Sequence, residues 1–259
     1  MLRSRIIPCL LVHNKGLVKT KKFSDPKYVG DPINAVKIFN EKLVDELIVL
    51  DIDATRDRRE PDYEMIRNLA SECRMPLCYG GGVSTVEQAV RISNLGVEKV
   101  AISASAFESG SLIEDMVAAI GKQSVVVVLD VKKTLWGSYD VYIRNGKKKV
   151  KGSFKDILRR IEERGAGEIV VNSIDCDGVM QGYDLKLIEL TRKELDIPLT
   201  VLGGAGTLEH IKEVVDLYRP IGVAAGSLFV FKGKFRAVLI NYPSVEKKKD
   251  MTIRFEGNQ

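Results

Sequence analysis

The sequence repeats itself once over a long distance, and this repeat restricts the possible folds more than any other feature. Asp51-Ile52-Asp53 in the first half corresponds to Ser173-Ile174-Asp175 in the second half, at an offset of 122 residues. The same offset relates further positions of the first half to identical residues in the second, namely Glu46, Pro76-Leu77, Gly81-Gly82, Thr85, Glu87, Ser105 and Phe107. A solenoid repeats with a shorter period of about 20 to 50 residues. The repeat therefore predicts two equivalent halves that meet near Lys122.

Short apolar runs alternate with amphipathic helical patterns eight times along the chain. The runs are nearly uniform in their hydrophobicity, which is typical of strands covered by helices on both faces. The predicted strands are Ile6–Val12, Glu46–Asp51, Leu77–Gly80, Lys99–Ser103, Val125–Asp130, Glu168–Ser173, Leu199–Leu202 and Gly222–Ala225. The predicted helices are Pro32–Lys42, Tyr63–Cys73, Thr85–Leu95, Leu112–Ile120, Phe154–Arg164, Leu185–Leu195 and Leu208–Leu217.

Eight strand–helix units in 259 residues predict an α/β fold, a single (β/α)8 TIM barrel built from two repeated half-barrels. The halves cover roughly residues 1–121 and 122–259, and each alone would leave open strand edges, so we expect one domain over residues 1–259. An open doubly wound sheet is the alternative. It is disfavoured because neither a GxGxxG nor a GxxxxGK[ST] pattern follows the first strand.

Composition excludes several classes of protein. Apolar residues make up 45% and charged residues 29% of the sequence, as in ordinary globular proteins. No apolar run reaches the ~18 to 20 residues of a membrane span, and Ile6–Val12 is too short for a signal peptide core. The four cysteines lie far apart without a CxxC pair and there are two histidines, so we expect no metal site and a reducing, cytoplasmic location.

The basic residues cluster mainly in two segments, 15–22 and 147–151, while the net charge is only +5. Aromatic residues are too sparse there for a base-stacking platform, so we expect no nucleic-acid partner and no membrane partner. A phosphorylated small molecule suits such basic segments at least as well. No cofactor motif is present, and we predict none.

The carboxyl ends of the strands should carry the ligand site, because a (β/α)8 barrel binds its ligands at that face. Glycines there let the backbone approach an anion, and the helix that follows offers free N–H groups. The predicted phosphate- or substrate-binding residues are Asp51, Gly81, Gly82, Ser103, Ser105, Asp175, Asp177, Gly203, Gly204, Gly226 and Ser227. They form two sites related by the repeat, of which we expect the second-half site to be better. Tight turns are the alternative explanation for each glycine pair.

Asp130 is the candidate catalytic residue. It ends the most hydrophobic strand, where a carboxylate is placed to act as a general acid or base. The alternative is a helix-capping or ion-paired aspartate. Two segments are expected to form mobile loops that cover the site, Lys15–Lys22 and Leu135–Lys151, and the second contains a predicted hairpin turn at Asn145-Gly146.

The chain resembles the cyclase subunit of imidazole glycerol phosphate synthase over its whole length. The motifs that carry the resemblance are RIIPCL, DELIVLDIDA, the GGG turn, EKVAIS, VVVVLD, RGAGEIVVNSIDCDG and LGGAG. The resemblance implies a glutaminase subunit docked at the bottom of the barrel and ammonia passing through its centre. It also implies an ammonia gate of alternating charges, for which the matching residues are Arg5, Glu46, Lys99 and Glu168. Without the resemblance, these four charges could equally be a stabilising ring of salt bridges.

The sequence departs from that family at the upper end of the barrel. The cyclase uses an aspartate at the end of the first strand and another at the end of the fifth; Asp130 matches the second, but Leu11 stands at the first. Ser103-Ala104 replaces the Asn-Thr pair that holds one substrate phosphate, whereas Lys19, expected in a flexible loop, is retained as a substrate-binding candidate.

These departures resemble a second, cyclase-like subunit in bacterial surface-polysaccharide pathways that make acetamidino sugars. DPKYVGDPINAVKIFNEK and LDIDATRDRREPD match that branch. The resemblance implies a synthase subunit that delivers ammonia to an ATP-dependent sugar amidotransferase, with little cyclase turnover of its own. Two alternatives stay open: a histidine-pathway cyclase with Asp130 alone, and a non-catalytic barrel that binds sugar phosphates.

Overall fold

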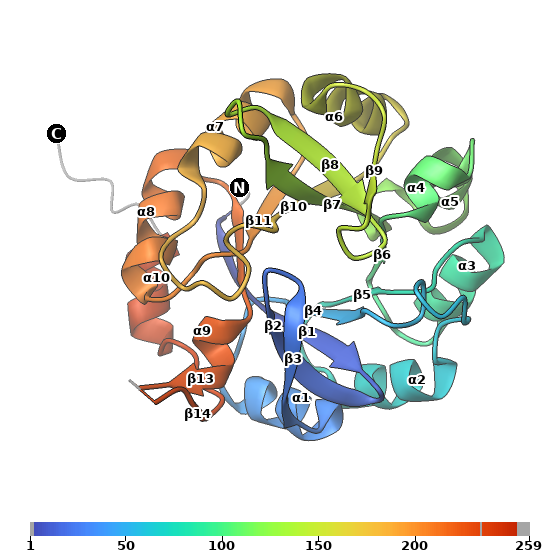
Figure 1. Ribbon diagram of the computed structural model, residues 1–259. Coiled ribbons are helices and arrows are strands. Elements are labelled where there is room, and N and C mark those ends of the chain that lie inside the picture. Colours follow the sequence, from blue (N-terminus) through green and yellow to red (C-terminus); the bar gives the residue numbers. More distant parts are fainter. Residues whose placement is uncertain (1–2, 234, 253–259) are drawn as a thin grey trace, which may run out of the picture.

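The eight apolar runs form the eight parallel strands of a closed barrel (Figure 1), which confirms the predicted fold class. The structure is a computed structural model that describes residues 3–233 and 235–252. Pairing of β12 with β1, and of β10 with β7, closes the barrel. The strands of the barrel, in order around it, are β1 (Arg5–His13), β4 (Leu47–Asp51), β5 (Leu77–Gly80), β6 (Lys99–Ile102), β7 (Val125–Lys133), β10 (Glu168–Ser173), β11 (Leu199–Leu202) and β12 (Gly222–Ala225).

Helices surround the barrel on its outer side (Figure 1). The longer ones are α1 (Pro32–Glu41), α2 (Tyr63–Glu72), α3 (Val86–Asn94), α5 (Leu112–Ile120), α6 (Phe154–Glu163), α7 (Leu185–Glu194), α8 (Leu208–Tyr218) and α10 (Val245–Thr252). The shorter ones are α4 (Ser105–Glu108), α9 (Ser227–Val230) and the 3-10 turn η1 (Lys122–Ser124). Thr85 and Thr207, which the repeat relates, both cap their helices by accepting a hydrogen bond from the backbone N–H three residues later.

The predicted boundaries agree with the structure to within one residue, except that β7 continues past Asp130 to Lys133. The expectation that Lys15–Lys22 is a loop is wrong. Most of this segment is strand β2 (Gly16–Lys21), which pairs with β1 and with β3 (Ser24–Gly30). Four consecutive residues of β2, Leu17 to Thr20, are buried, and pairing on both sides explains why a stretch with several lysines is a strand.

The second predicted cover is also built from strands. β8 (Tyr139–Ile143) pairs with the end of β7, and β9 (Lys148–Lys149) pairs with β8. The predicted turn lies between them, and Arg144, Asn145 and Gly146 all have positive φ angles, as tight hairpin turns require. The last hairpin joins β13 (Phe231–Lys232) to β14 (Ala237–Val238).

Two apolar cores hold the barrel together. The larger lies between the strands and the surrounding helices, and the smaller fills the barrel itself, around Ile7, Ile48, Val126 and Val170. Side chains alternate between the two cores along each strand. Among the residues that the structure describes, no helix has both the length and the apolar character to cross a bilayer.

Candidate functional site

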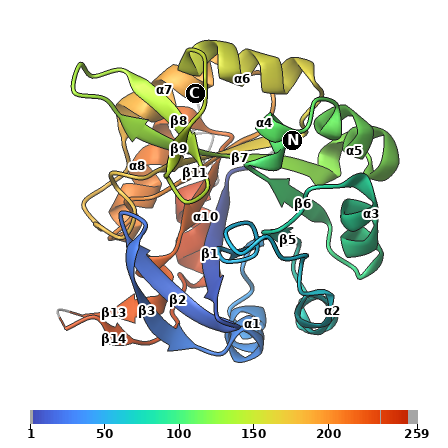
Figure 2. The ribbon, with the colours of Figure 1, turned by 45° about the vertical axis from the view of Figure 1, so that its right-hand side comes forward.

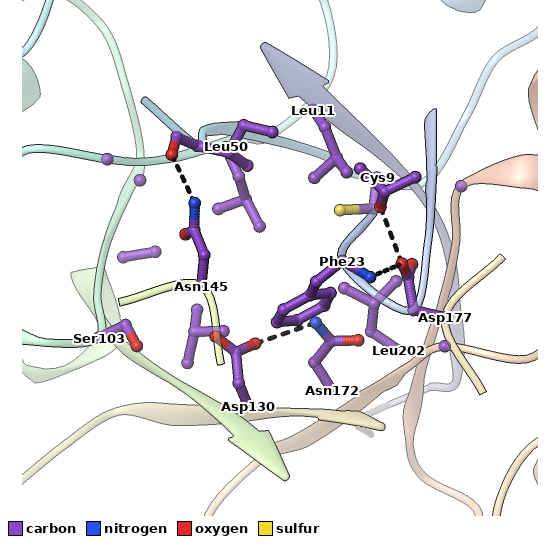
Figure 3. A pocket seen from close by; sticks show the side chains of 18 of the residues that line it. Cys9, Leu11, Phe23, Leu50, Ser103, Asp130, Asn145, Asn172, Asp177 and Leu202 are labelled. Carbon is purple, nitrogen blue, oxygen red and sulfur yellow. Dashed lines mark hydrogen bonds between the residues drawn. The ribbon is translucent and has the colours of Figure 1, made fainter. Parts of the chain in front are cut away.

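A cavity opens at the carboxyl ends of the barrel strands, which we call the upper mouth (Figure 3). Its floor is apolar and includes Cys9, Leu50, Val128 and Leu202. Its rim is polar and comes from both halves of the repeat. Of the predicted site residues, the cavity is lined by Lys19, Asp51, Gly81, Gly82, Ser103, Ser105, Asp130, Asp177, Gly203, Gly204, Gly226 and Ser227.

Asp130 lies at the wall of this cavity beside Asn172 of β10 (Figure 3). Asn172 Nδ2 donates a hydrogen bond to Asp130 Oδ1 at 3.0 Å. Burial raises the pKa of Asp130 to about 7; the hydrogen bond from Asn172 opposes the rise, and the Asp177 carboxylate adds to it. A carboxyl group that titrates near neutral pH can both accept and donate a proton, as a general acid–base group must.

Replacing Asp130 by Asn should stabilise the protein, and increasingly so as the pH rises. The carboxyl group ionises near pH 4 in the unfolded chain but near pH 7 in the folded protein, so the unfolded state loses its proton first. Ionisation between these values therefore favours unfolding, by up to roughly 4 kcal/mol at pH 8. Urea denaturation of both proteins at pH 4 and pH 8 measures the difference. An equal gain at both pH values would contradict a raised pKa.

Leu11 faces Asp130 from the opposite side of the barrel (Figure 3). It lines the cavity at the end of β1, with its side chain half-buried beside Leu50. A leucine side chain neither accepts nor donates a proton. The two walls of the cavity therefore differ: one carries a carboxyl group with a raised pKa, and the other is apolar.

The two glycine pairs occupy equivalent positions on opposite sides of the rim, as the repeat requires. Gly81 and Gly204 both have positive φ angles. A Cβ atom at Gly81 would collide with the Asp51 carbonyl oxygen, and one at Gly204 would collide with the carbonyl oxygen of Gly182. Close backbone packing alone therefore explains why these residues are glycines. The anion-binding role of the two pairs stays a prediction.

Lys19 lies in strand β2 rather than in a flexible loop, and its side chain is buried. Its ammonium group donates a hydrogen bond to the carbonyl oxygen of Cys9, and it lies so close to Gly226 that a Cβ atom there would need to displace it. Burial lowers the pKa of Lys19, while the Cys9 thiol and Asp177 oppose this effect. An anion bound in the cavity would favour the charged form of Lys19.

The three remaining aspartates of the predicted site have distinct positions. Asp51 lines the cavity, and its Oδ1 accepts hydrogen bonds from the backbone N–H groups of Asp53 and Ala54. Asp177 also lines the cavity. Asp175 does not: its carboxylate accepts a hydrogen bond from the backbone N–H of Lys133, outside the cavity. The structure therefore separates Asp175 from the other predicted ligand-binding residues, because its side chain holds the β7–β8 turn region instead.

Two hairpins lie at the upper mouth (Figure 1), and each is hydrogen-bonded to the opposite half of the barrel. We call β2–β3 the first cover and β8–β9 the second cover. In the first cover, Thr20 Oγ1 and the Phe23 backbone N–H donate hydrogen bonds to Asp177 Oδ2, at 2.8 and 3.2 Å. In the second cover, Asn145 Nδ2 donates a hydrogen bond to the Ile52 carbonyl oxygen at 3.0 Å.

A ring of four charges closes the other end of the barrel, which we call the lower mouth. The charge ring consists of Arg5, Glu46, Lys99 and Glu168, all predicted from the sequence. Lys99 Nζ lies 2.8 Å from a carboxylate oxygen of each glutamate. Arg5 also bridges both, at 2.7 Å to Glu168 and in direct contact with Glu46. Cations and anions therefore alternate around the ring.

The electrostatics of the charge ring are those of mutually stabilised ions. Burial alone would raise the pKa of Glu168, but Arg5 and Lys99 lower it well below the usual range. Burial alone would likewise lower the pKa of Lys99, but Glu168 and Glu46 raise it. Thr200 Oγ1 also donates a hydrogen bond to Glu168. Arg5, Lys99 and Glu168 are therefore charged at neutral pH.

The sequence did not single out three residues that shape these sites. Asn172 positions Asp130, and Phe23 extends over the cavity from the first cover. Thr200 donates a hydrogen bond to Glu168 of the charge ring. Each is an ordinary strand or loop residue whose role depends on a neighbour distant in the sequence. Within residues 3–233 and 235–252, no group of three or more His, Cys, Asp or Glu side chains is arranged to hold a metal ion.

Comparison with known proteins agrees with this geometry. Residues 5–236 match the model of a family described as histidine biosynthesis protein. A Vibrio vulnificus protein, provisionally named imidazole glycerol phosphate synthase subunit hisF3, is 57% identical over 250 residues, or 96% of each chain. A Pseudomonas aeruginosa protein, provisionally named subunit hisF2 of the same enzyme, is 51% identical over 247 residues, or 95% of this chain and 98% of its own.

The chain is less similar to a HisF subunit whose name is not provisional. The imidazole glycerol phosphate synthase subunit HisF of Streptococcus sanguinis is 39% identical over 232 residues, covering 88% of this chain and 91% of its own. Barrel, charge ring and upper mouth all lie within the matched region. The chain therefore belongs to the histidine biosynthesis protein family, in the group of proteins similar to subunit HisF of imidazole glycerol phosphate synthase.

Proposed function

We propose that this chain is a synthase subunit that receives ammonia from a glutaminase subunit and passes it through the barrel to an ATP-dependent sugar amidotransferase. The amidotransferase converts an acetamido group of a nucleotide sugar into an acetamidino group, in the cytoplasmic part of surface-polysaccharide (O-antigen type) biosynthesis. The observation that carries this proposal is the pairing of Asp130 with Leu11 across the upper mouth, because cyclisation needs a proton donor and a proton acceptor.

The barrel interior supports the transfer of ammonia. Between the charge ring and the upper mouth it is lined by apolar side chains such as Ile7, Ile48 and Val126. Neutral ammonia can cross such a lining, whereas the ammonium ion would lose its hydration without compensation. The glutaminase subunit would dock at the lower mouth, where its product meets the charge ring. Displacement of Lys99, which is partly exposed, would open the ring.

The second candidate function is cyclisation of the histidine-pathway substrate. Asp130 and Lys19 favour it, because a carboxyl group with a pKa of about 7 and a buried cation both face the cavity. Phosphates at the two glycine pairs would place a linear substrate across the mouth, above Asp130. This candidate lacks a second proton-transfer group at the position of Leu11.

The test is a reconstitution with purified glutaminase and sugar amidotransferase from the same organism. Acetamidino product should form from glutamine only when the barrel is present, and from ammonium salts without the glutaminase. Lys99→Ala should lower the glutamine-dependent rate at least about tenfold, since it removes charge-assisted contacts with both glutamates. The rate with ammonium salts should be unchanged.

Lys186→Ala, on the exposed surface of α7, is the matched control and should alter neither rate. Failure of the complete mixture to make acetamidino product would refute the proposed function. Equal loss of both rates in Lys99→Ala would refute the gate, because a gate affects only ammonia that enters at the lower mouth.

A further inference from the structure

The segment from Val131 to Ser153 contains seven basic residues and one acidic residue. We call it the basic ribbon; it comprises the end of β7, all of β8 and β9, and their turns. The whole chain has a net charge of only +5, so the remainder is slightly acidic. The basic ribbon is therefore the more basic of two such clusters, the other being residues 15–22.

Much of this charge has no ion-pair partner among the residues that the structure describes. Arg144 and Lys148 pair with Glu108, and Lys149 pairs with Asp140. Among the ion pairs of the described residues there is none that involves the other ribbon lysines, which are all exposed: Lys132, Lys133, Lys147 and Lys151. Free lysines at this density attract an acidic surface and speed its association.

The tip of the basic ribbon carries two apolar side chains that contact solvent completely. Leu135 and Trp136 have relative exposures of 102% and 96%, and Trp136 is the only tryptophan in the sequence. Their turn is closed by hydrogen bonds, because the Thr134 N–H donates to the Ser138 carbonyl oxygen and the two hydroxyl groups lie 2.7 Å apart. Tryptophan is among the residue types that most often dominate the energy of a protein interface.

The basic ribbon also lies next to the upper mouth. Asp130 and Lys132 are two residues apart on β7, so their side chains leave the strand on the same side, and Asp130 points into the cavity. Figure 2 shows the turn between β7 and β8 projecting beyond the barrel. A protein that covered the tip and this inner side would enclose the exit of the cavity.

We propose that the basic ribbon is the docking surface for the enzyme that accepts the ammonia, and that this enzyme presents an acidic surface with an apolar slot for Trp136. The inference rests on the proposed function, which requires an acceptor. Because ammonia released into water is diluted and protonated, the acceptor must seal against the upper mouth. The basic ribbon joins that mouth to an exposed apolar anchor, Leu135 and Trp136.

A protein partner fits the distribution of charge better than a membrane does. The exposed lysines extend along the ribbon from the tip to Lys149. Lys149 lies opposite Tyr142 in the β8–β9 register, and Tyr142 is six residues from Trp136, which is about 20 Å at ~3.3 Å per residue. A flat bilayer that contacts the tip would leave the lower lysines in water. A protein surface can follow the ribbon along its length and reach the mouth.

Calorimetric titration of the barrel–glutaminase complex with the purified sugar amidotransferase tests the proposal. Leu135→Ser combined with Trp136→Ser should raise Kd by about 30-fold or more, the loss expected for an interface hot spot. Lys132→Glu combined with Lys147→Glu should weaken binding and reduce its dependence on salt. Leu217→Ser and Lys186→Glu change an exposed leucine and an exposed lysine elsewhere, and should leave Kd unchanged.

Stimulation of the glutaminase should be normal in the ribbon variants, because that subunit docks at the other end of the barrel. Ribbon variants that bind the amidotransferase as tightly as the unmodified chain would overturn the docking surface, and product formation in the reconstitution would still support the proposed function. No binding and no product would remove both.

Two further experiments test whether the basic ribbon binds a membrane or a nucleic acid instead. Both measure the fluorescence emission of the single tryptophan. The barrel is mixed with vesicles of equal parts phosphatidylserine and phosphatidylcholine, or with a short single-stranded oligonucleotide. We expect no blue shift of the Trp136 emission in either arm. A shift that Lys132→Glu/Lys147→Glu abolishes would assign the ribbon to a membrane or a nucleic acid and overturn the proposal.

Discussion

With saturating ammonia, the unmodified chain should turn over the histidine-pathway cyclase substrate at least about 10²-fold more slowly than the ~1 s⁻¹ of an ordinary biosynthetic enzyme. One general acid–base group contributes about 10²- to 10⁴-fold to a rate, and the cavity offers Leu11 where the second group is needed. Single-turnover product formation at high enzyme concentration measures this rate. Turnover of about 1 s⁻¹ would return the chain to histidine biosynthesis.

Leu11→Asp should raise the residual cyclase rate, because it places a carboxylate at the cavity wall that faces Asp130. The side chain of Leu11 is only half-buried, so a carboxylate there keeps contact with water and does not require a partner. Leu11→Asn is the matched control, since it is polar and of similar size but transfers no proton. A gain that survives a second substitution, Asp130→Asn, would show that the two groups do not act together.

Arg5→Leu should lower the free energy of unfolding by about 3–5 kcal/mol at pH 8, the usual effect of removing one partner from a buried ion pair. Glu46 and Glu168 would then remain buried with Lys99 as their shared cation. Denaturation in urea at several pH values measures the loss. The loss should persist down to about pH 5 and shrink as the pH falls from there toward 2, because Arg5 and Lys99 lower the pKa of Glu168 to about 2 and its carboxylate is protonated only in that range.

Arg3→Leu is the control for this experiment. Arg3 also pairs with a carboxylate, Asp45, but at 3.7 Å and with most of its side chain in water. Exposed pairs contribute about 0–1 kcal/mol, so the effect should be small. Similar losses for Arg3→Leu and Arg5→Leu would mean that the charge ring is no more important for stability than a surface ion pair.

The barrel could be predicted from the sequence because its signals are local and repeated. A short, uniformly apolar run of β-branched residues such as Val125–Leu129 indicates a buried strand. The recurrence of Thr85 as Thr207 predicts the start of both helices. The members of the charge ring could be proposed because they match the charged gate of the family that the sequence resembles, and because each lies at the start of a strand. Parallel strands bring such positions together at one end.

What could not be predicted depends on contacts between distant segments. Strand β2 has four buried residues of six, but Lys19 among them makes the segment look like a solvated loop. The burial of Lys19 becomes visible only when the first cover lies against β1. In the sequence, Asn172 is indistinguishable from other strand residues. Its role follows from the pairing of β10 with β7, which places Asp130 beside it. Asp175 does not face the cavity as predicted. Like Asp53, its counterpart in the repeat, it accepts a hydrogen bond from a backbone N–H, that of Lys133, whereas Asp53 accepts one from Asn14.

Each of the two covers links one half-barrel to the other at the upper mouth. The first cover starts in one half and is held by Asp177 of the other, while the second cover starts in that other half and reaches back to Ile52. Each cover is therefore held by groups from both halves of the barrel. Substitution of Asp177 or Asn145 would release one cover from the opposite half and leave the other in place.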